Sequence, residues 1–512
     1  MMSTAKKSRG SGRNDESTSG EAVEFNVNKL SRELLIRVFG WLPFHQRHET
    51  IPLVCRKWAE LTSVPCPLWE HPCIDLQLYI DNHWRGTSID QQEVIVRWAN
   101  VLQWFSVRAS WVHSIEIRNF SEDFAAQHDC PSGGLASLFG TLWDYLENLY
   151  ISNCAPVMRP DDLVHLACFN KLVRLNIDSL RGPVKARQLN HLGRLTNLQE
   201  LRILFAGHGL EQNLLGGFPN HLTALRKLRE LELTSVGPGA FISLPESISN
   251  WVELRDLQLY RCGFEKVPEN ISALSKLDTL LMEGFSTPGL GSIELPDHMS
   301  RLTSLRRLIL SGWCYSSLPG VVGRLSQIQE LDFSFNPLPS LPSDFQCWHN
   351  LEVLKLNCCE LQKLPEAVRS CSKLIQLDVA ANDNLDAIPT GAYLANLRDL
   401  DLSRCDFHRI PSSLAGAINL ERLDMSYNTC MEVDAEGRLL LLNLPALKQI
   451  NITKDRLHAV GLRGRRSEFK PTPWTDCSMY NLFLLSKELM AHRPGRMIDV
   501  RLFDEQEVLS EM

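Results

Sequence analysis

The chain has 512 residues, of which 44% are hydrophobic, so it is long enough to bury a large core or to form several domains. Its formal net charge is −7, from 53 basic and 60 acidic residues, and this balance does not favour nucleic acid as a partner. No run of about 18 apolar residues is present, so we expect no membrane-spanning helix and no membrane partner.

Residues 1–25 are rich in Ser, Gly and charged residues and show no hydrophobic periodicity, which predicts a disordered tail. This segment has no apolar core and does not resemble a secretory signal. The 15 cysteines are scattered, and this pattern favours reduced thiols over a disulfide framework. We therefore predict a cytoplasmic and/or nuclear protein, with the cytoskeleton or axoneme as the alternative location.

Residues 28–73 read NKLSRELLIRVFGWLPFHQRHETIPLVCRKWAELTSVPCPLWEHPC. The helical spacing of the apolar residues after Ser31 predicts one helix that ends at Pro43. A second short helix is expected after Pro52, and Leu68 and Trp69 form a third apolar patch. Three short helices in about 45 residues make a poor independent core. Their apolar face is therefore expected to need a partner, either the rest of the chain or another protein.

This stretch resembles an F-box. The family pattern appears here as Leu30, Glu33-Leu34-Leu35, Val38-Phe39, Leu42-Pro43, Val54-Cys55, Trp58 and Leu68-Trp69. Two departures are Ser31, where the family usually has proline, and the polar run 45–50, where it often has an aliphatic residue.

The resemblance implies that residues 26–75 form a small helical domain that binds the Skp-type adaptor of a Skp–cullin–F-box ubiquitin ligase, and through it the cullin and RING subunits. An F-box protein does no chemistry itself, so no enzyme activity is implied. The alternative is a helical cap for the array that follows. The adaptor-binding residues implied by the resemblance are Leu30, Leu34, Leu35, Val38, Phe39, Leu42, Pro43, Val54, Trp58 and Trp69.

Residues 76–111 are predicted to be a helical linker, or N-terminal cap, in front of a repeat array. The segment QQEVIVRWANVLQWFSVRA is amphipathic, and we interpret its aromatic residues as core rather than as a ligand site.

Six segments between Leu305 and Asn428 start 23 residues apart and fit L-x-x-L-x-L-x-x-N/C, with Trp313 as the one misfit at the last position. A period of this length with this pattern is the leucine-rich-repeat signature. Relaxing the period extends the array to about fourteen repeats over residues 112–460. The predicted repeats start at Val112, Leu146, Leu172, Leu198, Leu228, Leu254, Leu277, Leu305, Ile328, Leu351, Leu374, Leu397, Leu420 and Leu447.

The repeat pattern predicts an α/β solenoid, a horseshoe with a parallel concave sheet. Side chains alternate along a strand, so Leu400 and Leu402 should both point into the core. The ninth residue, often Asn, falls where the chain turns and should bond backbone groups that the turn leaves unpaired. A proline fourteen residues after several starts, such as Pro268 or Pro411, should open a short outer helix or turn. These strings resemble the Leu-Pro class of intracellular repeat proteins.

Residues 461–512 are predicted to be a C-terminal cap and tail. They contain a basic loop, a helix and the segment MIDVRLF, which is a candidate for a last strand.

Outward strand positions are the candidate substrate-binding residues, because apolar residues exposed on a sheet face usually mark interaction sites. The acidic set favours a protein substrate with a basic segment, although Asp is also a common default of the repeat at these positions. The apolar members in the middle of the array are Tyr260, Leu281, Ile309 and Val353. The acidic members toward the C-terminus are Asp332, Asp378, Asp399, Asp401 and Asp424.

Phosphate-binding loops and zinc-protease motifs are absent from the sequence, and we predict neither a cofactor nor a metal site. Two function classes remain. The first is the substrate receptor of a ubiquitin ligase, which captures the protein targeted for ubiquitination and degradation. The second is a protein-binding scaffold in signalling or on the cytoskeleton, without a ubiquitin-ligase role.

Overall fold

The computed structural model divides the chain into two compact units, Met1–Leu68 and Trp69–Met512. The boundary falls inside the predicted F-box stretch, between Leu68 and Trp69. The structure describes residues 31–40, 42, 47, 52, 58–60, 63–65, 67–70, 72–75, 103–118, 140, 142, 144–152, 161, 163–181, 184–206, 218–237, 244–262, 266–284, 292–338, 348–364, 366–428, 431–452, 484–485, 487 and 499–501.

The first unit is built on helix α1 (Arg32–Gly40). The hydroxyl of Ser31 accepts a hydrogen bond from the backbone N–H of Leu34 (3.3 Å), so Ser31 caps the helix as expected. Leu35 and Phe39 lie one turn apart and are buried, and the ring of Phe39 meets that of Trp58 edge-on at 4.6 Å. These side chains form the described core of this unit. The predicted residues Leu30, Pro43 and Val54 lie outside the described residues.

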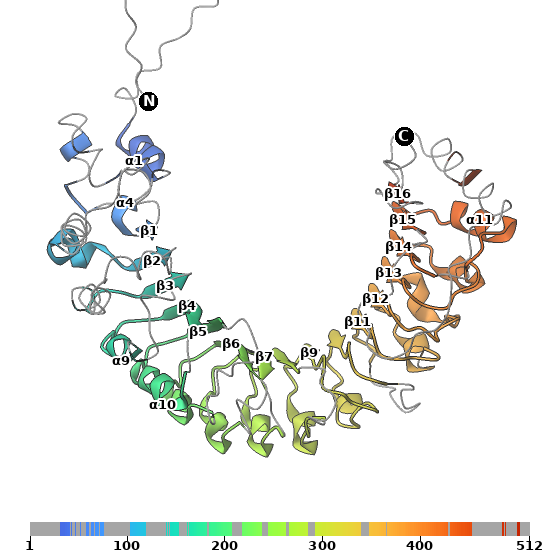
Figure 1. Ribbon diagram of the computed structural model, residues 1–512, viewed down its shortest axis with the longest axis horizontal. Coiled ribbons are helices and arrows are strands. Elements are labelled where there is room, and N and C mark those ends of the chain that lie inside the picture. Colours follow the sequence, from blue (N-terminus) through green and yellow to red (C-terminus); the bar gives the residue numbers. More distant parts are fainter. Residues whose placement is uncertain are drawn as a thin grey trace, which may run out of the picture. The chain divides into compact units, whose positions relative to one another are not determined.

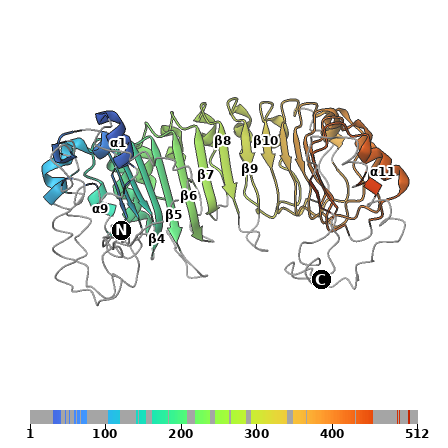
Figure 2. The ribbon, with the colours of Figure 1, turned by 90° about the horizontal axis from the view of Figure 1, so that it is seen from above.

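The second unit contains one parallel sheet whose strands follow each other in chain order (Figures 1 and 2). Each of the fourteen predicted repeat starts lies two residues before the first residue of a strand, from β2 to β15, which confirms the repeat register. The strands are β1 (Cys73–Asp75), β2 (Ser114–Arg118), β3 (Asn148–Ser152), β4 (Arg174–Arg181), β5 (Glu200–Ala206), β6 (Glu230–Gly237), β7 (Asp256–Cys262), β8 (Thr279–Glu283), β9 (Arg307–Ile309), β10 (Glu330–Asp332), β11 (Val353–Lys355), β12 (Gln376–Asp378), β13 (Asp399–Asp401), β14 (Arg422–Asp424), β15 (Gln449–Asn451) and β16 (Asp499–Arg501).

The sheet is one strand longer at each end than the fourteen repeats. At one end β1 pairs with β2, so residues 73–75 belong to the sheet and not to a helical domain, which corrects the prediction for them. At the other end β16, within the candidate last strand of the sequence, pairs with β15. Both terminal strands are only three residues long and carry no leucine repeat of their own. They are strands because their backbones form hydrogen bonds with the adjacent strand of the array.

The core of the second unit lies behind the sheet, because the central residue of each short strand points inward. Leu377, Leu400 and Leu423 occupy matching positions on adjacent strands, and each is at most 2% exposed. Leu402 is fully buried as well, as the alternation predicts. Stacked repeats thus share one continuous apolar interior, which no single repeat could build alone.

Short helices connect the strands on the outer side of the array, opposite the inner side that the strands line (Figure 1). Pro268 directly precedes η8 and Pro411 directly precedes η13, as predicted for the recurring proline. The 3-10 segments are η3 (Ala109–Trp111), η5 (Asn190–Arg194), η6 (Asn220–Ala224), η7 (Glu246–Asn250), η8 (Glu269–Ala273), η9 (Asp297–Arg301), η10 (Val322–Arg324), η11 (Glu366–Ser370), η12 (Ala392–Ala395) and η13 (Ser412–Gly416). The other α-helices among the described residues are α4 (Pro67–Glu70), α9 (Leu163–Leu166), α10 (Ala186–Leu189) and α11 (Ala435–Leu442).

The predicted turn asparagines are Asn336, Asn382 and Asn428, and each is at most 1% exposed. The side-chain oxygen of Asn336 accepts from the backbone N–H groups of Trp313 (2.9 Å) and Tyr315 (3.1 Å). Its amide donates to the carbonyl of Phe333 (2.7 Å) and to one in the preceding repeat. The asparagines therefore pair the backbone groups that the turn frees, as the sequence predicts.

The residue before each of these turn positions adopts a left-handed backbone conformation, with φ between 50° and 74°. Gly312 meets this requirement without strain, but the other repeats place a side chain there. Because left-handed backbone is costly for non-glycine residues, the hydrogen bonds of the turn must fix it. The row consists of Arg261, Gly312, Phe335, Cys358, Ala381, Arg404 and Tyr427.

Candidate protein-interaction surface

The outward side chains of the sheet form two columns that run across the strands in register. In the short strands the first residue belongs to one column, which we call the outer column, and the third belongs to the other, the central column. Both columns lie on the sheet surface, and the residue between them is buried. The outer column from β5 to β14 reads Glu200, Glu230, Asp256, Thr279, Arg307, Glu330, Val353, Gln376, Asp399 and Arg422. The central column over the same strands reads Arg202, Glu232, Gln258, Leu281, Ile309, Asp332, Lys355, Asp378, Asp401 and Asp424.

Charges on the N-terminal strands of this surface are paired with each other. Arg174 lies 2.8 Å from Glu200, and Arg202 lies 2.9 Å from Glu230 and 3.7 Å from Glu232. The hydrogen bond to Glu230 is the main cause that raises the pKa of Arg202. Exposed pairs of this kind add little stability. Because the positive and negative side chains are paired, this end of the surface is neither clearly basic nor clearly acidic.

The middle of the surface is less uniformly apolar than predicted. Leu281 and Ile309 are neighbours in the central column, but Leu281 is only 9% exposed. Its neighbours on both sides, Gln258 and Ile309, are bulky, which accounts for its burial. Val353 lies in the outer column, two strands away from Ile309, so the structure separates it from the other aliphatic residues.

Tyr260 belongs to a linked set on β7. Its hydroxyl donates to the side-chain oxygen of Gln258 (2.9 Å), and the amide of Gln258 donates to Asp256 (2.9 Å). Burial raises the pKa of the Tyr260 phenol and also that of the Asp256 carboxyl. These bonds fix the Tyr260 side chain against Gln258, which pairs with Leu281 on the next strand.

The C-terminal strands carry carboxylates without ion-pair partners among the described residues. Asp378, Asp401 and Asp424 are consecutive members of the central column. Each accepts a hydrogen bond at 2.9–3.1 Å from the backbone N–H two residues further on, which fixes its side chain. Lys355, which separates them from Asp332, lies 3.3 Å from Glu330 and pairs with it instead.

Asp399 differs from this group, because it lies in the outer column and forms an ion pair with Arg422. The predicted acidic set is therefore divided into three adjacent unpaired carboxylates, one paired carboxylate, and Asp332 beyond Lys355. We call Asp378, Asp401 and Asp424 the acidic triplet.

Burial is the main cause that raises the pKa of Asp378 and Asp401, and neighbouring carboxylates add to it. A carboxyl whose pKa is higher in the folded state than in the unfolded state disfavours folding wherever it is ionised. This penalty is present above the folded-state pKa and disappears as the pH falls toward the ordinary aspartate value.

Asp401→Asn is therefore expected to raise the melting temperature at neutral pH, because the amide oxygen can still accept from Ser403 while the charge is gone. The gain should shrink as the pH approaches the ordinary pKa of aspartate. Thermal melts followed by circular dichroism across this range test the prediction, with the exposed Asp386→Asn as control. A melting temperature for Asp401→Asn that is lower than the parent's at neutral pH would contradict it.

Helix α1 in the first unit offers a second surface. Leu34 and Val38 lie one turn apart and are 46% and 45% exposed, whereas Leu35 and Phe39 are buried. Leu42 is half-buried. Trp69 belongs to the second unit, where it is buried with its ring 4.9 Å from that of Trp104. The predicted adaptor-binding residues are thus split between exposed and core positions.

One exposed residue on the sheet surface was missing from the sequence-based set. Leu204 on β5 is 38% exposed. It pairs with Thr234 on β6, which in turn pairs with Tyr260 on β7. Leu204 occupies the seventh position of its repeat, so extending the outward positions to the earlier repeats would have found it. Phe335 is 49% exposed in the left-handed row. In that row Arg404 also lies over the ring of Tyr427, at 5.1 Å.

No helix in the described part of the chain has the length and hydrophobicity needed to span a bilayer. The same residues hold no cluster of His, Cys, Asp and Glu suited to a metal ion.

Residues 242–480 match the family model described as leucine-rich repeat region. The TMV resistance protein N of Nicotiana glutinosa is 33% identical over 156 residues, which are 30% of this chain and 13% of that protein. A probable disease resistance protein of Arabidopsis thaliana is 30% identical over 179 residues, 30% of this chain and 21% of that protein. The chain thus spans only a small part of either relative.

Among solved structures, a leucine-rich-repeat protein of Leptospira interrogans is similar over 67% of this chain and 83% of its own, with 19% sequence identity and a TM-score of 0.48.

Proposed function

We propose that this chain, which carries a leucine-rich-repeat region with a protein-binding role, is the non-catalytic substrate receptor of a Skp–cullin–F-box ubiquitin ligase. In this proposal residues 28–73 bind the Skp-type adaptor. The sheet surface from β7 to β14 captures the protein that is to be ubiquitinated and degraded. The repeats and their protein-binding role rest on the family match, and the ligase role rests on the F-box resemblance together with the properties of α1.

The exposed apolar pair on α1 is the observation that supports adaptor binding most directly. The helix buries Leu35 and Phe39 inside its own unit and still presents Leu34 and Val38 to solvent. A helix that needed only to hold its unit together would carry polar residues at those two positions. Apolar residues one turn apart on an exposed helix face are the usual anchors of helix-to-protein contacts.

The sheet surface supports substrate capture through two different features. Tyr260 and Ile309 supply an aromatic and an aliphatic side chain of the kind that provides most binding energy in protein interfaces. The acidic triplet lacks ion-pair partners among the described residues and would steer a basic segment toward the same surface. The substrate class that fits best is therefore a protein with a basic stretch next to an apolar one.

A non-catalytic role agrees with the causes of the unusual ionisation on this surface. The raised pKa values of Asp378 and Asp401 come first from burial, and both carboxyls are held by their own backbone. Burial likewise raises the pKa of the Cys359 and Cys405 thiols to about 12, so these cysteines stay protonated and unreactive at neutral pH.

The alternative is a leucine-rich-repeat scaffold that binds proteins without a ligase role. It is favoured by the extent of the family match, which begins at residue 242 and includes none of residues 28–73. Both functions use the repeat surface, so only adaptor binding discriminates between them.

The full chain is expected to bind a purified Skp-type adaptor, and Leu34→Glu combined with Val38→Glu should weaken that binding at least tenfold, since loss of one buried anchor costs about 2 kcal/mol or more. Both side chains are exposed, so the variant should fold normally. Isothermal titration calorimetry with purified components measures the change. The matched control is Val252→Glu combined with Ile418→Glu, which alters two residues of similar exposure in the repeats. If the α1 variant and the parent bind the adaptor with equal affinity, the F-box interpretation is wrong. The leucine-rich-repeat scaffold without a ligase role would then be the function that fits.

A further inference from the structure

Stretches of the outer segments of three successive repeats carry basic residues and no acidic ones, and the first stretch begins just after Asp161 and Asp162. The segments are residues 163–173, 184–199 and 218–229, none of which contains Asp or Glu, although the whole chain has a net charge of −7. The corresponding segments of later repeats are mixed, with Glu246 and Glu253 in one and Glu294 and Asp297 in another. The basic residues of the three segments are His165, Lys171, Lys185, Arg187, His191, Arg194, His221, Arg226, Lys227 and Arg229.

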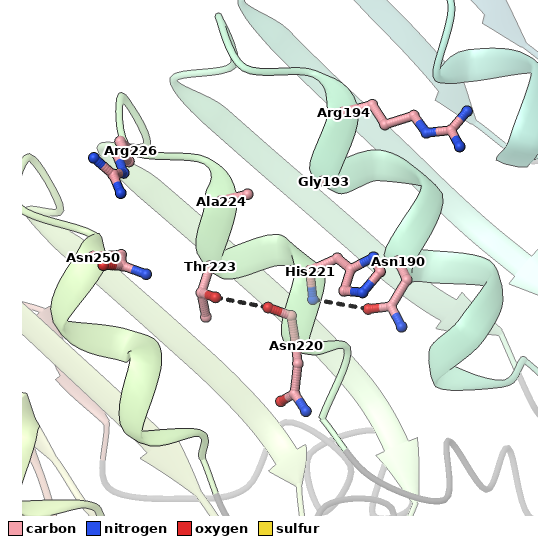
Figure 3. A pocket seen from close by; sticks show the side chains of 9 residues that line it. All are labelled: Asn190, Gly193, Arg194, Asn220, His221, Thr223, Ala224, Arg226 and Asn250. Atoms are coloured by element: carbon pink, nitrogen blue, oxygen red, sulfur yellow. Dashed lines mark hydrogen bonds between the residues drawn. The ribbon is translucent and has the colours of Figure 1, made fainter.

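This basic region contains a notch between η5 and η6, with η7 at its edge (Figure 3). Its volume is about 430 Å³, within the range of small-ligand pockets. Two arginines, one histidine and three asparagines line it, and no acidic side chain is among the lining residues. The lining side chains that can donate hydrogen bonds to an anion are Asn190, Arg194, Asn220, His221, Arg226 and Asn250.

The walls of the notch are held together by close backbone contact. A Cβ atom on Gly193 would lie 2.3 Å from the carbonyl oxygen of His221, so only glycine fits where η5 meets η6. The backbone N–H of His221 donates to the side-chain oxygen of Asn190 (3.0 Å). The hydroxyl of Thr223 donates to the carbonyl of Asn220 (2.7 Å). The notch is therefore a preformed feature of the packed repeats.

The two arginines of the notch have no carboxylate partner among the described residues. Arg194 and Arg226 are exposed, in contrast to Arg174 and Arg202 on the sheet side, which form ion pairs. The nearest described carboxylate before this region, Asp161, accepts a hydrogen bond from Gln188 (2.6 Å). The notch is thus flanked on opposite sides by two guanidinium groups, Arg194 and Arg226, that form no ion pair with a described carboxylate (Figure 3).

The lining favours one kind of anion. Guanidinium groups match the geometry of phosphate oxygens, and amide side chains add neutral donors. The lining has no Phe, Tyr or Trp on which a nucleic-acid base would stack, and no large apolar side chain that would enter a bilayer. We propose that this notch binds a phosphorylated side chain, phosphoserine or phosphothreonine, of a protein partner. The site lies away from the sheet surface and does not depend on adaptor binding.

Fluorescence polarisation of the full chain with short degenerate peptides that carry a fixed central phosphoserine tests this proposal, with the serine peptides as the reference. The parent should bind the phosphoserine pool at least roughly tenfold more tightly, because each charge-assisted hydrogen bond to phosphate is about twice as strong as a neutral one. Arg194→Ala combined with Arg226→Ala should remove that preference. The matched control is Arg301→Ala combined with Arg324→Ala, on the outer side of later repeats, and should retain it.

Several outcomes would overturn the proposal. One is equal binding of the phosphoserine and serine pools by the parent, and another is an unchanged preference in the Arg194 and Arg226 variant. A third is tighter binding, dependent on the same arginines, of single-stranded RNA, of vesicles containing phosphoinositides, or of inorganic phosphate alone. Matching circular dichroism melts of parent and variant establish that a lost preference comes from the notch and not from unfolding.

Discussion

Replacement of Asn382 by alanine is expected to lower the free energy of unfolding by at least about 4 kcal/mol, because a buried backbone group left without a partner costs roughly 1–3 kcal/mol. The side-chain oxygen accepts from the N–H groups of Cys359 (3.0 Å) and Leu361 (2.9 Å). The amide donates to the carbonyls of Leu356 (2.9 Å) and Val379 (2.6 Å). Alanine supplies none of these bonds, and the site is fully buried from water.

Urea unfolding followed by circular dichroism measures this loss, and two controls separate the buried network from asparagine in general. Asn396→Ala removes an exposed side chain that donates one bond, to the carbonyl of Ser372 (2.7 Å). Cys405→Ala removes the thiol at the same position of the next repeat, which donates to the carbonyl of Val379 (3.3 Å). Both should cost about 1 kcal/mol. If Asn382→Ala unfolds at the same urea concentration as Asn396→Ala, the turn asparagine does not hold the repeats together.

Leu400→Asp is expected to disrupt the central repeats. Leu400 is 2% exposed and lies between Leu377 and Leu423 on the neighbouring strands. The substitution loses roughly 1.5–3 kcal/mol of leucine burial and places an unpaired carboxylate in the core, which costs several kcal/mol more. Because stacked repeats stabilise their neighbours, the loss should spread beyond one repeat.

Hydrogen exchange followed by mass spectrometry shows how far the Leu400→Asp disruption extends. We expect faster exchange over β12 to β14, together with a lower melting temperature. The control is Ile418→Asp, which places the same charge at a residue that is 53% exposed in the same repeat and should exchange like the parent. Identical exchange and melting of Leu400→Asp and the parent would mean that the inward and outward assignment of the strands is incorrect.

The repeat architecture was predictable because one physical constraint recurs at a fixed spacing. Each strand must bury a central leucine and the turn after it must pair its backbone, so residues such as Leu400 and Asn382 mark the register directly. The left-handed residue before the turn was not predictable. Only Gly312 carries a local signal for it, whereas Phe335 and Tyr427 adopt it because the surrounding turn imposes it.

The composition of the sheet surface was harder to derive, because exposure depends on neighbouring strands. Alternation placed Leu281 on the outward side correctly, but bulky neighbours cover it. Likewise, Asp399 and Asp401 look equivalent in sequence, yet only Asp399 lies beside an arginine on the next strand, Arg422. Pairings of this kind follow from register between repeats and not from the repeat itself.

Other features depend on elements whose sequence signal is weak. Trp69 was grouped with the helical stretch because it fits the F-box pattern, but it packs with Trp104 in the second unit. The notch at Arg194 and Arg226 is lined from three successive outer segments. The pattern N-H-L-x-x-L-x-x-L that the η5 and η6 segments share marks their buried leucines and does not reveal the two arginines. The net charge of the whole chain also does not reveal this basic region, because the acidic residues are concentrated elsewhere.

We propose that one chain carries two separate binding surfaces, helix α1 for the adaptor and the repeat sheet for the substrate. The most direct test captures partners from cells with the tagged full chain and quantifies them by mass spectrometry at equal expression of three variants. Leu34→Glu with Val38→Glu should lose the Skp-type adaptor and keep the remaining partners. Ile309→Arg should keep the adaptor and lose those partners, and Val252→Glu with Ile418→Glu should lose neither. Adaptor capture that persists in the α1 variant, or a partner set unchanged in Ile309→Arg, would contradict the claim.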